Sequence, residues 1–389
     1  MNNVTTYGCP PWSWRTTTTI AAFICITVAI SLGGCDPIHT KKDDSISNLS
    51  FSHDGKKVVF DRCRSEGCQI QVYDLATGEL AAYQSPKNER WTMGRYAYDG
   101  KRIAFSIIPV KSGKSPLSFL AEDVLDLGNM QIAVMDADGK NFRKVTSDPG
   151  AKLYPVFSHN GKKILYACAA YIRESGGTPA ANYDAWEVDL ETGRQTRLTF
   201  HEYFYMGYLS YYPDDERFIY YGSRPLVYED MRFNYMNEYA FGAKMVELER
   251  QGKGIHGVVV MKGKELIPHA YDFGEKVRAE KPLLSKDGSI LLYEKSVSGG
   301  DFYLYSPDGN HRLVGQGGSV NSAAISPDGD FIGMITFSIH IFTVRDGKRK
   351  VILYLPSAPK TIENWEEAYR RNKKLYRMIP ERPSHILNR

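Results

Sequence analysis

Residues 155–166 read PVFSHNGKKILY, and residues 49–60 read LSFSHDGKKVVF. Each stretch consists of a short strand-like run, a polar turn around Asn-Gly or Asp-Gly, and a more apolar run. Either dipeptide suits the positive φ angles of a tight hairpin turn. The pattern returns in RYAYDGKRIAF (95–105), LSYYPDDERFIYY (209–221), PLLSKDGSILLY (282–293) and AAISPDGDFIGMI (323–335). We therefore interpret the chain as a repeat protein.

A second hairpin signal follows each copy of the repeat, as in QIQVYDLATGELAAYQ (69–84) and WEVDLETGRQTRLT (186–199). Two hairpins per unit make a four-stranded blade, which buries both of its faces only by stacking against other blades around an axis. The 34 glycines and the 12% aromatic content are typical of many short strands joined by tight turns. The sequence therefore predicts an all-β fold, a six-bladed β-propeller of four-stranded blades over residues 46–356.

The repeat resembles that of TolB-like propellers, which are related to WD-type repeats and to the propeller domains of prolyl oligopeptidases. In that family it reads roughly P-x-x-S-P-D-G-x-x-[IL]-x-[FY], followed by a strand that ends near Leu-Thr. Residues 155–166 with Leu198 and Thr199, and residues 323–335, match it best. The resemblance implies the fold but no particular activity, because propellers host many unrelated functions. We expect no counterpart of the α/β domain that precedes the propeller of TolB.

The spacing of the repeats sets the expected boundaries of the blades. They are 46–86, 87–148, 149–200, 201–270, 271–316 and 317–356. A C-terminal tail, 357–389, follows the last blade. Within it residues 361–379 (TIENWEEAYRRNKKLYRMI) predict a short helix that Pro380 ends. This helix docks on the propeller or binds a partner or a membrane surface.

Residues 1–34 have the features of a secretion signal. Arg15 is the only charge before the apolar run 20–32, and the run ends in Leu32-Gly33-Gly34-Cys35, which resembles the bacterial lipobox. The resemblance implies that Cys35 is lipidated and that residues 35–45 form a linker to the propeller. We expect a membrane-anchored lipoprotein of the bacterial cell envelope with a periplasmic propeller. The alternative is an uncleaved N-terminal anchor.

Three cysteines remain after Cys35. Cys63 and Cys68 flank a hairpin-sized loop, so we expect a disulfide between them in an oxidising compartment. Cys168 is expected to be a buried, small apolar residue. The formal net charge is +4 and no basic stripe occurs, which argues against nucleic acid as a partner.

Long insertions between the second and third strands of three consecutive blades cover residues 107–130, 167–185 and 222–257. Equivalent positions place them on one face of the disc, where loops on a rigid scaffold usually bind. Aromatic residues gather in this region: Tyr203, Phe204, Tyr205 and Tyr208 before the fourth copy, and Tyr228, Phe233, Tyr235 and Tyr239 in the third insertion. They form either a satellite core or a recognition surface for a protein or a glycan.

No Gly-x-Ser-x-Gly elbow, H-E-x-x-H motif, Walker loop or dinucleotide fingerprint occurs, so we expect neither a cofactor nor an enzyme. His201, His256 and His269 form the only candidate histidine cluster, and a metal site there is a weak alternative. The sequence favours a lipid-anchored envelope scaffold that binds a protein through blades two to four. The alternatives are a glycan-binding or glycan-cleaving, lyase-like propeller, and an accessory subunit held by the C-terminal helix.

Overall fold

The computed structural model describes the central part of the chain. The described residues are 45–64, 67–112, 123–175, 178–225, 257–268, 270–271, 273, 279–295, 301–315, 322–335, 338–344 and 349–354. Strands are the only regular elements within these ranges. The N-terminal segment with Cys35, the C-terminal tail with its expected helix, and most of the third insertion lie outside them.

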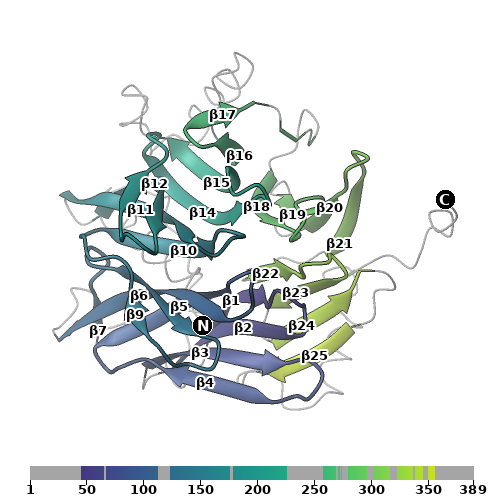
Figure 1. Cartoon of the computed structure of the whole chain (residues 1–389), viewed down its shortest axis with the longest axis horizontal. Helices are drawn as coiled ribbons and strands as arrows, with labels where there is room; N and C mark the ends of the chain where they lie inside the picture. The colour runs from purple at the N-terminus through teal and green to yellow at the C-terminus, as the bar shows by residue number, and fades with distance from the viewer. Residues whose placement is uncertain are drawn as a thin grey trace, which may run out of the picture.

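The strands form six antiparallel blades in chain order (Figure 1). The first contains β1 (Ser45–Phe51), β2 (Lys57–Arg64), β3 (Gly67–Asp74) and β4 (Leu80–Gln84). The second contains β5 (Glu89–Tyr96), β6 (Arg102–Ser112), β7 (Asp123–Leu125), β8 (Gln131–Asp136) and β9 (Arg143–Lys144). The third contains β10 (Ala151–Phe157), β11 (Lys163–Ser175), β12 (Thr178–Asp189) and β13 (Gln195–Arg197).

The fourth blade contains β14 (Tyr203–Tyr211), β15 (Arg217–Pro225), β16 (Gly257–Lys262) and β17 (Glu265–Ile267). The fifth contains β18 (Ala279–Leu284), β19 (Leu291–Lys295), β20 (Asp301–Tyr305) and β21 (His311–Gly315). The sixth contains β22 (Ser322–Ile325), β23 (Phe331–Ile335), β24 (Ser338–Thr343) and β25 (Arg349–Tyr354). The predicted six-bladed, all-β propeller is thereby confirmed.

The ring closes through the first strand of each blade, here called the inner strand. Each of β1, β5, β10, β14, β18 and β22 contacts the next, and β1 also contacts β22 and β23 of the last blade. Every blade consists of consecutive strands, so no strand is exchanged between the first and last blades in the described part of the chain. Figure 1 shows β22–β25 lying beside β1–β4. Side-chain packing, and not an exchanged strand, must therefore join the first and sixth blades.

An apolar cluster closes the junction of the first and sixth blades. Leu49 and Phe51 pack with Ala324, Ile335 and Ile339, and all five are buried. The Leu49 amide also donates a hydrogen bond to the Ser322 hydroxyl in β22, at 3.1 Å. Similar clusters lie between the other blades, as the stacking of two-faced apolar sheets requires.

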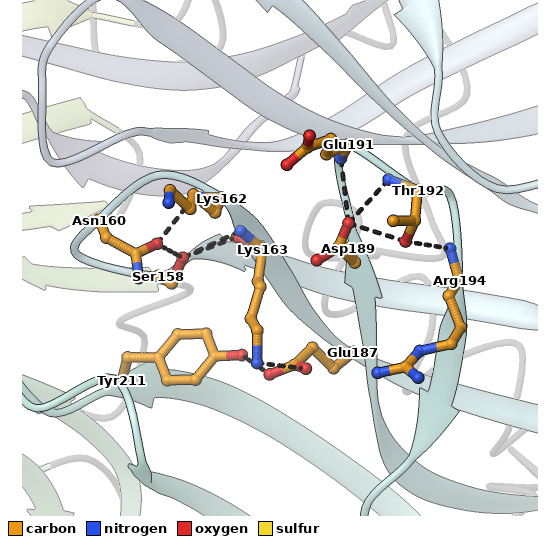
Figure 2. A network of polar contacts seen from close by, with 10 residues as sticks. All are labelled: Ser158, Asn160, Lys162, Lys163, Glu187, Asp189, Glu191, Thr192, Arg194 and Tyr211. Carbon is orange, nitrogen blue, oxygen red and sulfur yellow. Dashed lines mark hydrogen bonds and ion pairs between the residues drawn. The ribbon is translucent and has the colours of Figure 1, made fainter.

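The repeat residues build the Asp-Gly turn, which Figure 2 shows in the third blade. The Ser158 hydroxyl donates to Asn160 Oδ1 at 2.9 Å and accepts a hydrogen bond from the Lys163 amide at 3.0 Å. Gly161 has φ 69°, a conformation that favours glycine. The same serine contacts recur in the first, fifth and sixth blades through Ser52, Ser285 and Ser326. The Ser-x-Asp-Gly sequence therefore supplies the hydrogen bonds of the turn.

We expect Ser158→Ala to lower the free energy of unfolding by about 1–3 kcal/mol, because the Lys163 amide loses the hydroxyl that accepts its hydrogen bond. The Ser158 side chain is fully buried, so water cannot easily replace that acceptor. Urea unfolding followed by tyrosine and tryptophan fluorescence measures the change. Glu191→Ala, an exposed position in a neighbouring turn of the same blade, is the control and should stay within about 0.5 kcal/mol of the native protein. Equal losses in both variants would contradict the assignment.

Candidate functional site

The insertion in the third blade is a two-stranded ribbon. We expected residues 167–185 to form a loop, and this prediction was wrong. Strand β10 pairs with β11 only as far as Ala151↔Ala169, whereas β11 and β12 stay paired as far as Ser175↔Thr178. The pairing of β11 with β12 continues beyond the blade after a register shift between Ala169 and Ile172. We call residues 170–182 the ribbon.

The ribbon projects from the face opposite the Asp-Gly turns. Strand β11 begins directly after the turn at Gly161 and runs away from it, so its far end lies on the other face of the disc, here called the loop face. The insertion 107–130 begins on the same face, where β6 extends to Ser112 and pairs with β7. The predicted placement of these two insertions on one face agrees with the strand directions. The third insertion, between β15 and β16, lies almost entirely outside the described residues.

Tyr203 belongs to the core and not to an accessible surface. Its side chain is fully buried, and its ring packs edge-on against Tyr220 at 5.8 Å between centroids. A Cβ atom on Gly222 would lie 2.6 Å from the Tyr203 ring, so the glycine makes room for it. Tyr203 also pairs with Tyr183 of β12, which joins the third and fourth blades into one continuous sheet. The sequence could not separate this core role from a binding role.

Tyr205 and Tyr208 are partly accessible and join a third tyrosine. The hydroxyl groups of Tyr154 and Tyr205 lie 2.9 Å apart, and the Tyr154 ring stacks on that of Tyr208 at 5.5 Å. We call these three residues the tyrosine cluster. Burial raises the pKa of Tyr205 and of Tyr208 well above the ordinary value, so both keep their protons at neutral pH. Tyr154 was missed because it comes from the preceding repeat.

The other predicted aromatic residues are not tested by the structure. The Phe204 side chain and residues Tyr228, Phe233, Tyr235 and Tyr239 lie outside the described part of the chain. His256 and His269 also lie outside it. Burial, followed by the charge of Arg197, lowers the pKa of His201. No group of three His, Cys, Asp or Glu side chains suited to a metal ion occurs among the described residues.

The inner strands share a bulge that the sequence did not indicate. In five of them the pairing with the second strand shifts register around a residue with positive φ. These residues are Asn48, Met93, Tyr154, Tyr208 and Lys281. A bulge bends the strand and turns backbone groups away from the sheet. Each bulge thus exposes amide groups at the boundary between neighbouring blades.

Asp61 occupies one of these boundaries. Its Oδ2 atom accepts hydrogen bonds from Asn48 Nδ2 at 2.6 Å, Thr92 Oγ1 at 2.6 Å and the Met93 amide at 2.7 Å. Its Oδ1 atom accepts a further one from the Gly94 amide at 3.3 Å. Burial raises the pKa of Asp61 to about 6, and the hydrogen bonds oppose that shift. The Asp61 carboxylate of blade one is therefore hydrogen-bonded to the bulge of β5 in blade two.

A pocket lies where the inner strands of the six blades meet, and we call it the axial channel. It has a cavity volume of about 70 Å³, which holds several water-sized groups. The five blades with a bulge each contribute the residue two positions after it, namely Ser50, Arg95, Val156, Ser210 and Leu283. The sixth blade contributes Ala324 of β22. Toward the Asp-Gly turns, His53, Tyr98 and Lys286 also line the channel.

The described cysteines offer no nucleophile. The Cys63 and Cys68 sulfur atoms are 2.11 Å apart in a disulfide across β2 and β3. Cys168 is buried, and burial raises the pKa of its thiol to about 11. A thiol with such a pKa is almost fully protonated at neutral pH. Within the described ranges, no helix is both long and apolar enough to span a membrane.

The sheets and the channel define the protein as a six-bladed β-propeller. No family model matches the chain, and no curated protein matches it. Among solved structures it is similar to TolB from Acinetobacter baumannii, with 17% identity and a TM-score of 0.43 over 69% of this chain and 54% of the other. The chain thus spans about half the length of that TolB.

Two further solved structures resemble the chain. An oligogalacturonate lyase in complex with manganese has 15% identity and a TM-score of 0.48, over 81% of this chain and 78% of the lyase. The β-propeller domain of the trilobed protease from Pyrococcus furiosus has 13% identity and a TM-score of 0.45, over 81% and 99% of the two chains. These proteins differ in activity, and the likeness transfers none of their activities to this chain.

Proposed function

We propose that the protein is a lipid-anchored propeller of the bacterial cell envelope that binds a protein partner through its loop face. The lipobox-like motif ending at Cys35 supports the anchor, and the Cys63–Cys68 disulfide fits an oxidising compartment. The observation that carries the binding role is the ribbon. Its base is the rigid third blade, and the proposal does not depend on any catalytic group.

The ribbon offers two strand edges to a partner. Among the described residues, β11 beyond Ala169 pairs only with β12, and β12 pairs with β14 only at Tyr183↔Tyr203. Open edges carry backbone N–H and C=O groups that can pair with an added strand. The pairing at Tyr203 ties the base of the ribbon to the fourth blade. A partner strand would therefore add to a preformed template on the loop face.

A crosslinking pull-down from native membranes tests the proposal. The test variant replaces residues 171–181 by Asn-Gly, which closes the shortened hairpin with a tight turn. We expect the native protein to crosslink to one envelope protein with crosslinks on the loop face, and we expect the variant to lose that partner. Far-UV circular dichroism and the melting temperature should be unchanged, because the ribbon lies outside the blade.

A chain ending at residue 356 is the matched control, since it removes the tail and keeps the propeller. Loss of the partner from this truncation, with full retention in the ribbon variant, would contradict the proposal and favour an accessory subunit held by its tail. Recovery of polysaccharide in place of a protein would contradict it too. That outcome would favour the glycan alternative and direct attention to the tyrosine cluster.

A further inference from the structure

The lining of the axial channel is positively charged. Arg95 comes from the inner strand of the second blade and Lys286 from the turn of the fifth. No Asp or Glu belongs to the lining, whose other members are apolar, aromatic or hydroxyl-bearing residues and His53. Low-dielectric walls that carry charge of one sign focus the electrostatic field and attract the opposite charge. The channel is therefore suited to an anion.

Arg95 has no ion-pair partner among the described residues. Its guanidinium group makes no hydrogen bond and no ion pair with any described residue, although it lies close enough to Tyr98, Tyr154 and Tyr208 to interact with their phenol groups. Burial lowers the pKa of Arg95, which shows that its charge is partly stripped of water. The guanidinium nevertheless stays protonated at neutral pH, because its ordinary pKa is above 12.

Asp61 forms no ion pair with Arg95. Asp61 interacts with it electrostatically, but four hydrogen bonds from other groups already engage the Asp61 oxygens. Arg95 is only partly buried, so an acceptor that enters the channel can reach its guanidinium donors.

We propose that the channel binds a compact oxyanion group, a carboxylate or a phosphate, against the Arg95 guanidinium. The planar fork of arginine donors matches two oxygen atoms of either group. The Ser50 and Ser210 hydroxyls belong to the same lining, and Lys286 lies exposed at the mouth, where it attracts the anion. A volume of about 70 Å³ admits only a small head group. This site is separate from the ribbon and does not depend on the proposed function.

Chemical modification of the native protein tests the site without a mutation. Butanedione, a compact reagent for guanidinium groups, labels accessible arginines, and mass spectrometry measures the labelling of each one. We expect labelling of Arg95 to slow about tenfold when succinate or phosphate is present at about ten times its Kd, because only the unoccupied fraction reacts. Succinamide, which has the same size without the charge, should not protect it. Arg194, exposed on the third blade, is the internal control that neither anion should protect.

The two anions distinguish a carboxylate ligand from a phosphate ligand. Protection by succinate alone would assign a carboxylate ligand, and protection by phosphate alone a phosphate. Labelling of Arg95 that no anion slows would overturn the proposal. An unreactive Arg95 beside a labelled Arg194 would overturn it as well, because the channel would then admit no compact ligand. As a second measurement, calorimetry with the protecting anion should show binding to the native protein and none to Arg95→Met at unchanged melting temperature.

Discussion

Replacing Asp61 by alanine is expected to lower the free energy of unfolding by about 2–4 kcal/mol at neutral pH, because several buried donors lose their acceptor at once. Thr92 and Met93 are almost fully buried, so water cannot easily take the place of the carboxylate. The loss of stability arises at the boundary between the first two blades, where the bulge of β5 would lose its hydrogen bonds to Asp61. Urea unfolding measures the loss.

The raised pKa of Asp61 predicts that the free energy of unfolding depends on pH. Its pKa is about 6 in the folded protein and about 3.9 in the unfolded chain, so between these values the folded state binds more protons. Stability therefore falls as the pH rises from about 4 to about 6, by about 3 kcal/mol in total from this group, and changes no further above that range. Asp61→Asn cannot titrate, and the difference in unfolding free energy between the two proteins should show this slope.

The asparagine variant is also the control for the alanine variant, because its side-chain oxygen can still accept hydrogen bonds from Thr92 and Met93. We expect it to retain most of the stability that Asp61→Ala loses at neutral pH. If the two variants are equally unstable, the carboxylate charge matters and the hydrogen-bond acceptor does not. If native and Asp61→Asn proteins have parallel pH profiles, the four hydrogen bonds keep the pKa of Asp61 near its ordinary value.

Tyr203→Ala is expected to lower the free energy of unfolding by about 3–5 kcal/mol, the usual range for deleting a large buried ring. The ring fills the space beside Gly222 and packs against Tyr220. The substitution would loosen the place where the third and fourth blades form one sheet. A reduced capture of a partner by this variant would follow from the loss of the fold and would not mark Tyr203 as a contact residue.

Tyr203→Phe keeps the ring and removes only the hydroxyl, so it should cost about 1 kcal/mol. Unfolding experiments on the two variants separate packing from hydrogen bonding. A Tyr203→Ala variant as stable as the native protein would show that Tyr203 is not part of the core. A phenylalanine variant as unstable as the alanine variant would place the effect in the hydroxyl group and not in the packed ring.

The Asp-Gly turns were predictable because their determinants lie within a few residues of one another. Ser158, Asn160 and Gly161 are neighbours in the chain, and together they supply the hydrogen bonds and the positive φ of the turn. Six such turns, each in the same strand context, were enough to predict the propeller. The fourth copy, which lacks the glycine, still forms its turn, with Asp215 at φ 54°. Local chemistry therefore tolerated one departure from the pattern.

The candidate site was predicted only in part. Tyr205 and Tyr208 are near each other in the chain, but Tyr154 joins them from another blade, and Tyr203 points into the core. Alternation along β14 does not separate buried from accessible side chains, because Tyr203 and Tyr205 are two residues apart and the pairing shifts register between Gly207 and Ser210. The ribbon was misread as a loop, because its strand pairing continues past the end of the blade without a distinct sequence signal.

The sequence by itself determined the repeat, the strands and turns of each blade, and hence the number of blades in the ring, because these depend on residues close together in the chain. Only the tertiary structure decided what lies between blades. The bulges, the hydrogen bonds of Asp61 to blade two and the position of Arg95 in the channel arise where inner strands from distant repeats meet. One repeat carries no information about the side chains that face it across the axis, since those come from other copies of the same pattern.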